Sequence, residues 1–133
     1  MEPQNLVPTL ACLFFAAAFL QSSLDKLYDR QGNLEFLQGH FAKTPLARFV
    51  PAMLLSVTVM EFASGVLCLV GAASLWFFPG NWATVGLGLA ATTLLMLFTG
   101  QRIAKDYVGA AVLAGYFAVA LIGLAALPLA VGT

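Results

Sequence analysis

The chain has 133 residues, of which 61% are hydrophobic and only 9% are charged. Soluble domains of this size carry charged side chains at about a quarter of their positions, so this composition excludes an ordinary water-soluble domain and predicts a single transmembrane domain, residues 1–133. Six basic and six acidic residues cancel, so no net charge directs the protein toward nucleic acid.

Four segments are long and apolar enough to cross a membrane, since crossing about 30 Å of hydrocarbon takes about 20 mostly apolar residues in a helix. They cover residues 6–24, 49–75, 82–100 and 107–131, and Glu61 is the one charged residue inside them. The short connections predict an all-α, up-down-up-down four-helix bundle. We expect the first segment to be a retained span rather than a signal peptide, because no basic residue precedes it and no small-residue cleavage site follows it.

Residues 25–48 form the longest connection and mix charged and apolar side chains. Leu34, Phe36 and Leu37 alternate there with polar residues. This mixture is typical of an amphipathic segment that lies at the membrane interface. We therefore predict an interfacial connection between the first two spans.

All basic residues lie in two connections, residues 25–48 and 101–106, which share one side of a four-span protein. Because basic loops face the cytoplasm, both termini are predicted to lie outside. Acidic residues accompany the basic ones, so a polar site built from these charges is the alternative reason for their distribution. The basic residues are Lys26, Arg30, Lys43, Arg48, Arg102 and Lys105.

Glu61 is the most informative residue of the sequence. It stands about 12 residues into the second span, hence roughly 18 Å deep. An ionised, unpaired carboxylate at that depth costs several kcal/mol, so we expect Glu61 to be protonated, paired or facing a cavity inside the bundle. Two interpretations remain open: an acid that handles protons or binds a ligand, and a neutral carboxyl that only joins two helices.

Other polar residues predict a cluster around Glu61 at the charged membrane face. Thr58 lies one helical turn from Glu61, and Gln21 lies one turn from Asp25, which outlines a polar path inward from Asp25 and Lys26 to Glu61. The third span ends on the same face. Ion pairs and lipid-phosphate contacts at helix ends are the structural alternative. The predicted cluster comprises Gln21, Asp25, Lys26, Asp29, Thr58, Arg102, Lys105 and Asp106.

Metal and nucleotide chemistry have little support in the sequence. His40 is the only histidine, and Cys12 and Cys68 lie in separate apolar runs with no Cys-x-x-Cys spacing; we expect two buried free thiols. No phosphate-binding loop or nucleophile elbow occurs. We therefore predict no metal site, assign no catalytic residue and expect no cofactor bound by this chain alone. If the protein takes part in electron transfer, the carrier is a lipid-soluble quinone or belongs to a partner subunit.

Several short motifs recur in one known family. They are Ser22-Ser23-Leu24-Asp25-Lys26-Leu27-Tyr28-Asp29, Glu61-x-x-x-Gly65 with Gly71, Gly100-Gln101-Arg102 and Asp106-Tyr107-x-Gly109-Ala110. With these motifs the chain resembles the DoxX family of small four-helix bacterial membrane proteins over nearly its whole length. The resemblance implies a multi-pass protein of the bacterial inner membrane, associated with oxidoreductase assemblies such as a thiosulfate:quinone oxidoreductase.

The chain also departs from the family pattern. Many relatives carry an arginine before the first span and a Thr-Arg pair after the second, whereas residues 3–8 and 74–78 contain neither. The residues that fall on matching positions are Asp25, Lys26, Glu61, Gly65 and Arg102.

Three functional hypotheses follow. The first is a subunit or accessory of a membrane-bound oxidoreductase complex that interacts with quinone or a partner redox subunit, with Glu61 and the charged cluster lining a cavity. The second is a structural or assembly subunit of a larger membrane complex, based on small residues at helical spacing: Gly86, Gly88, Ala90 and Ala91, then Ala111, Gly115 and Ala118. The third, a small-solute transporter, lacks a broken helix in mid-membrane. The expected partners are lipid and other membrane subunits.

Overall fold

The computed structural model describes residues 5–131, and side chains as far as Leu127. Every regular element in this part of the chain is helical, which confirms the all-α prediction. In chain order the elements are α1 (Leu6–Tyr28), α2 (Arg30–His40), the short 3-10 helix η2 (Ala47–Phe49), α3 (Val50–Phe77), α4 (Trp82–Ile103) and α5 (Tyr107–Val131).

Four of these helices, α1, α3, α4 and α5, are long and apolar enough to cross a membrane. They coincide with the four predicted spans, but three of them end later than predicted. α3 ends at Phe77, two residues past Leu75. α1 continues past Leu24 to Tyr28 and α4 continues past Gly100 to Ile103. Nothing in either stretch breaks a helix, so the backbone stays helical after the apolar run ends. As a result Asp25 and Lys26 belong to a helix and not to a loop.

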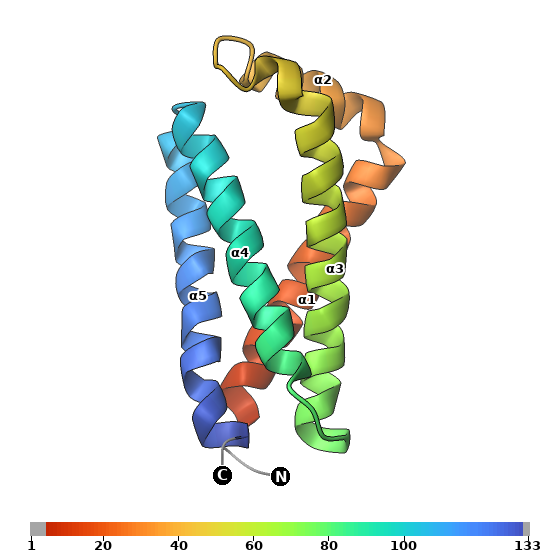
Figure 1. Cartoon of the computed structure of the whole chain (residues 1–133), viewed down its shortest axis with the longest axis vertical. Helices are drawn as coiled ribbons and strands as arrows, with labels where there is room; N and C mark the ends of the chain where they lie inside the picture. The colour runs from red at the N-terminus through yellow and green to blue at the C-terminus, as the bar shows by residue number, and fades with distance from the viewer. Residues whose placement is uncertain (1–4, 132–133) are drawn as a thin grey trace.

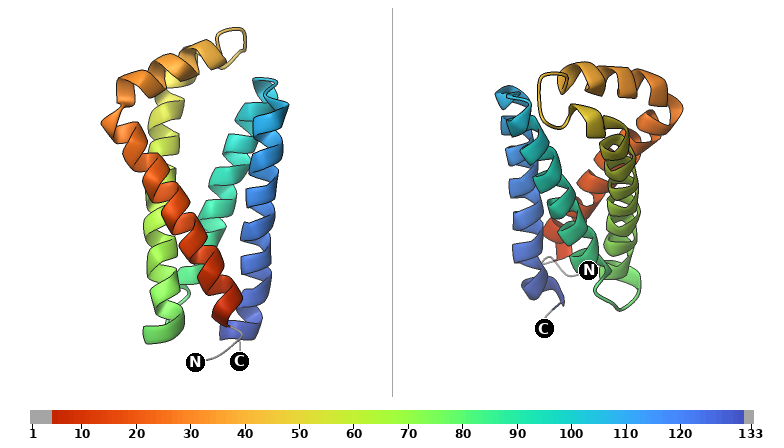
Figure 2. Two further views of the ribbon diagram at one scale, coloured as in Figure 1. Left: turned by 180° about the vertical axis from the view of Figure 1, so that it is seen from behind. Right: turned by 45° about the horizontal axis from the view of Figure 1, so that its top comes forward.

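The long helices are close together at one end and diverge toward the other (Figure 1). The beginning of α1 and the end of α5 lie at the closed end, and α2 lies across the opposite, open end. Seen from behind, α1 crosses α3 diagonally on its way to α2 (Figure 2). The most extensive packing joins α1 to α3 and α3 to α4, followed by α4 to α5.

Glycine and small side chains allow the close packing at the closed end. A Cβ added to Gly71 would lie 2.6 Å from Cα of Ala83, and one added to Gly86 would lie 2.8 Å from the backbone nitrogen of Cys68. The backbones of α3 and α4 therefore touch. Cys12 and Cys68 lie in this core as buried free thiols, as expected.

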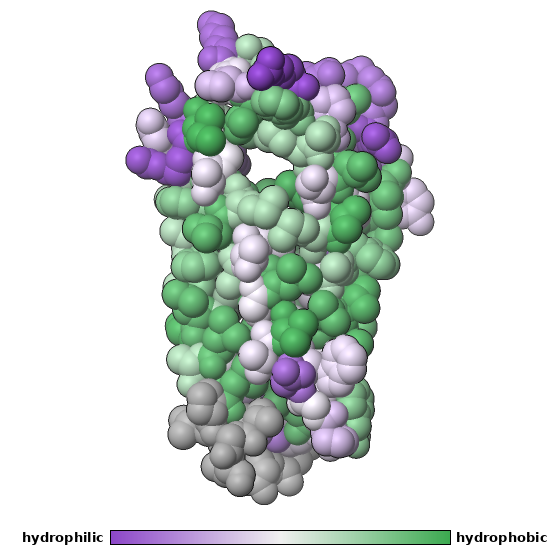
Figure 3. All heavy atoms as spheres, in the orientation of Figure 1, coloured by the Kyte–Doolittle hydropathy of each residue, from purple (hydrophilic) through white to green (hydrophobic). Residues whose placement is uncertain are grey.

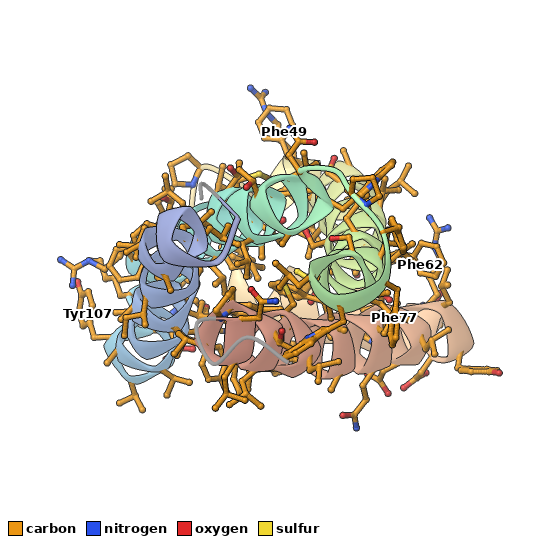
Figure 4. The ribbon with its side chains drawn as sticks, turned by 90° about the horizontal axis from the view of Figure 1, so that it is seen from below. Phe49, Phe62, Phe77 and Tyr107 are labelled. Atoms are coloured by element: carbon orange, nitrogen blue, oxygen red, sulfur yellow. The ribbon has the colours of Figure 1, made fainter. Side chains whose placement is uncertain are left out.

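Large apolar side chains cover the outside of the bundle. In the view from below, Phe49, Phe62, Phe77 and Tyr107 point outward from the helices (Figure 4), and Phe77 is 84% exposed. Hydrophilic residues gather at the end that carries α2 (Figure 3). An apolar outer surface with one polar end indicates a multi-pass membrane protein.

The predicted interfacial connection contains a helix. α2 has no buried residue, and Phe36 on it is 66% exposed. The side chain of Asp29 caps α2 by accepting a hydrogen bond of 3.2 Å from the backbone nitrogen of Gly32, the usual role of an aspartate at a helix start.

Candidate functional site

Glu61 forms an ion pair inside the bundle. Its Oε1 lies 2.9 Å from Nζ of Lys26, and its side chain is only 4% exposed. Nζ also donates a hydrogen bond of 2.7 Å to Oγ of Ser22. Oε1 has no aligned hydrogen bond among the described residues, so its short contact with Nζ is an electrostatic contact of poor hydrogen-bond geometry. The carboxylate is thus paired, one of the three environments expected for it.

The spacing of the sequence explains how Lys26 reaches Glu61. Gly65 follows the acid by one helical turn, and a Cβ there would lie 2.7 Å from Cγ of Leu20 and 3.1 Å from its backbone nitrogen. The glycine therefore lets α1 approach α3 directly. Measured from this contact toward the open end, Lys26 lies about 9 Å along α1 and Glu61 about 6 Å along α3. The two residues are therefore at similar heights in the bundle, and the long lysine side chain covers the remaining difference.

A cavity of about 530 Å³ lies between the diverging helices beneath α2. Pockets for small molecules usually measure about 300–1,000 Å³. In the space-filling view the molecule is hollowed at this level, next to mostly apolar or weakly polar residues (Figure 3). The apolar lining includes Phe15, Phe19, Leu54, Leu94 and Leu113, and the residues with polar side chains are Ser22, Lys26, Asn33, His40, Glu61, Gln101 and Tyr116. The ion pair is therefore part of a cavity wall.

A second set of polar residues lines the cavity on the side of α4. Nε2 of His40, at the end of α2, lies 2.8 Å from Oε1 of Gln101. It also lies 3.8 Å from Oδ2 of Asp106. The other carboxylate oxygen of Asp106 accepts a hydrogen bond of 3.0 Å from the backbone nitrogen of Gly109 and so caps α5. His40 thereby connects α2 to the other half of the bundle.

The predicted polar path to Glu61 holds for Lys26, which contacts the carboxylate, but not for Gln21 and Asp25. Both side chains are exposed, on a part of α1 that borders a separate shallow depression. Thr58 is buried one turn from Glu61, but its hydroxyl donates to the backbone oxygen of Leu54 in its own helix. Lys26 is the member of the predicted cluster that reaches Glu61.

The remaining predicted residues lie apart from this pair. The guanidinium of Arg102 stacks 4.7 Å above the ring of Tyr107. Lys105 is exposed in the turn with a positive φ of 62°. Asp29 and Asp106 serve as helix caps. Among the described residues no hydrogen bond or ion pair joins the turn after α4 to the charged end of α1, because the helices diverge there.

Sequence reasoning missed two of the cavity residues, His40 and Gln101. In the sequence His40 stands out only as a possible metal ligand, and Gln101 only as part of a family motif. The available signal is the mixed polar and apolar pattern of residues 25–48, which contains the single histidine. Within the described residues no group of three or more metal-ligating side chains comes together.

Comparisons of the chain with protein-family models, curated proteins and solved structures give no match. Membership of the DoxX-like family therefore stays a prediction. The function has to be argued from the cavity and its polar residues.

Proposed function

We propose that this chain is a DoxX-like subunit or accessory of a membrane-bound oxidoreductase complex, and that its cavity binds the head group of a quinone. The observation that carries the proposal is the Lys26–Glu61 ion pair on the wall of a largely apolar cavity. A charged pair inside a membrane bundle is costly, and such residues usually mark a functional site.

The chemistry of the lining suits a quinone. Its ring is flat and apolar, and its two carbonyl oxygens accept hydrogen bonds. A lysine ammonium has three donors. One is donated to Ser22 and the contact with Glu61 is electrostatic, which leaves donors for a ligand oxygen. Glu61 holds Lys26 in place and balances its charge. Electrons would come from a partner subunit.

The membrane setting belongs to the same proposal. We place the protein in the bacterial inner membrane as an up-down-up-down bundle with both termini outside. The support is that every basic residue lies in or next to α2, or at the adjacent ends of α1, α3 and α4. The positive-inside rule assigns this end to the cytoplasm.

Binding of a short-tailed benzoquinone to the purified protein tests the proposal. Glu61→Gln removes the charge of the ion pair and keeps the shape, so we expect an affinity loss of about tenfold or more and loss of quinone-dependent activity in native membranes. Glu35→Gln changes an exposed carboxylate of α2 and is the matched control. Unchanged binding and unchanged quinone reduction by a normally folded Glu61→Gln protein would refute the proposal.

A second candidate function is an assembly subunit without redox chemistry of its own. A Cβ added to Gly88 or Gly115 meets no atom of the described residues within 4 Å, so these two positions of the predicted small-residue seams are free to contact another helix. Co-purification with a multi-subunit membrane complex at fixed stoichiometry would favour this function. A monodisperse protein without partners in mild detergent would argue against it.

A further inference from the structure

The hydrogen bonds of His40 determine which ring nitrogen can donate a hydrogen bond and which can accept one from a molecule in the cavity. Nε2 lies 2.8 Å from Oε1 of Gln101, and Nδ1 has no hydrogen-bond partner in the described part of the chain. An amide oxygen only accepts hydrogen bonds, so the bond requires a proton on Nε2. In a neutral imidazole the other nitrogen, Nδ1, is then an acceptor.

The orientation of the Gln101 amide supports this assignment, because amide oxygen and nitrogen are distinguished by their surroundings. A Cβ added to Gly109 would lie 2.8 Å from Nε2 of Gln101 and 2.7 Å from Oδ2 of Asp106. The amide nitrogen, a donor, and this carboxylate oxygen thus both lie beside Gly109. The amide oxygen is left to face His40.

We propose that the cavity selects the reduced, hydroxyl-bearing form of its ligand, a quinol, because neutral His40 presents an acceptor to it. This inference rests on the proposed quinone site. A quinol donates one hydroxyl hydrogen to Nδ1 of His40, and its second oxygen accepts a hydrogen bond from Nζ of Lys26. A quinone has carbonyl oxygens at both positions, so one of them faces the lone pair of Nδ1.

The charged groups that lie nearest to His40 or line the same cavity come from α1, α3 and the turn after α4. Asp106, in the turn after α4, is the nearest charge at 3.8 Å. Lys26 of α1 and Glu61 of α3 line the same cavity and form their own pair. Asp106 and Gln101 act as positioning residues, since they orient the ring and fix the position of its proton.

Comparing the affinities for a short-tailed benzoquinol and the matching benzoquinone tests the inference. The measurement uses the full chain in mild detergent, without oxygen, at pH 8, where an ordinary imidazole is neutral. We expect the quinol to bind about tenfold more tightly, the effect of one hydrogen bond gained against one acceptor left facing a lone pair.

Variants separate the role of His40 from a general effect on folding. His40→Phe keeps an aromatic ring beside Phe36 but removes the acceptor, and is expected to abolish the preference. Gln101→Met keeps the imidazole but frees its proton, and is expected to reduce the preference while both forms still bind. Lys43→Gln, at an exposed position of the same connection, should retain the tenfold preference.

The outcomes are distinguishable. Equal or tighter binding of the quinone by the unmodified protein, or a preference that survives His40→Phe, would overturn the inference and leave the quinone site intact. Binding of neither form would overturn the proposed function, and the inference with it.

Discussion

Replacing Lys26 with methionine removes the cation beside a carboxylate that is almost completely buried. Nζ of Lys26 lies 2.9 Å from Oε1 of Glu61, whose side chain is 4% exposed. Methionine keeps much of the volume of lysine, so the substitution mainly changes charge. A buried carboxylate without a partner is more costly than a protonated carboxyl, and we therefore expect the carboxyl to take up a proton when the variant folds.

The expected cost depends on pH. Glutamate in an unfolded chain ordinarily titrates near pH 4.3, and each pH unit above that value adds about 1.36 kcal/mol to the cost of protonation. At pH 7 the variant should lose about 3.7 kcal/mol of unfolding free energy, within the range of about 3–5 kcal/mol for breaking a buried ion pair. At pH 5 the loss should be about 1 kcal/mol. Because folding takes up a proton, the variant becomes more stable as the pH falls.

Unfolding by sodium dodecyl sulfate in mild-detergent micelles, followed by circular dichroism at pH 7 and pH 5, measures this difference. The double variant Lys26→Met with Glu61→Gln should recover most of the stability at pH 7, because no charge is left unpaired. Lys43→Met, at an exposed position, is the control. The reasoning is wrong if the loss is equal at both pH values, or if the double variant is as unstable as the single one.

Two further predictions use the same unfolding assay. Gly71→Ala places a methyl carbon 2.6 Å from a backbone atom of α4 and should lower the unfolding free energy by about 1–3 kcal/mol. Gly115→Ala meets no atom of the described residues within 4 Å and should raise it by up to about 1 kcal/mol, since alanine favours a helix. The opposite order of stability would contradict the close contact of α3 and α4. The hydroxyls of Ser64 and Thr93 lie 3.1 Å apart, and that of Thr93 also donates to its own helix. Thr93→Val should therefore cost about 1–3 kcal/mol by leaving Ser64 without a partner, and Ser64→Ala about 1 kcal/mol or less; equal losses would show that the two hydroxyls do not depend on each other.

The helices could be predicted because their signals are local. Apolar runs of the required length identified all four spans, and the mixed polar and apolar pattern of residues 25–48 identified the connection that contains α2. The ends of α1 and α4 could not be predicted from hydropathy, because a helix stops where its backbone is capped and not where its side chains become polar. Asp29, which caps α2, is the local signal that explains the boundary at Tyr28.

The candidate site depends on which faces of the helices meet, and that information is not local. Glu61 was identified from its depth alone, and the structure pairs it with Lys26. Periodicity along α1 placed Gln21 and Asp25 on the same path, although both are exposed. The crossing of α1 and α3 turns these two outward, and the close contact at Gly65 sets that crossing. His40 reaches Gln101 only because α2 lies across the diverging helices, which no short pattern records.

The cavity lies among the diverging spans, below the polar end of the molecule. In a bilayer the acyl tails of neighbouring lipids can enter such a space. A ligand that enters the cavity then displaces a lipid tail, and its apolar part gains little binding free energy because it does not leave water. Discrimination then depends on the few polar atoms of the wall. A detergent with a long alkyl chain should act as a competitor, and binding constants measured in different detergents should differ accordingly.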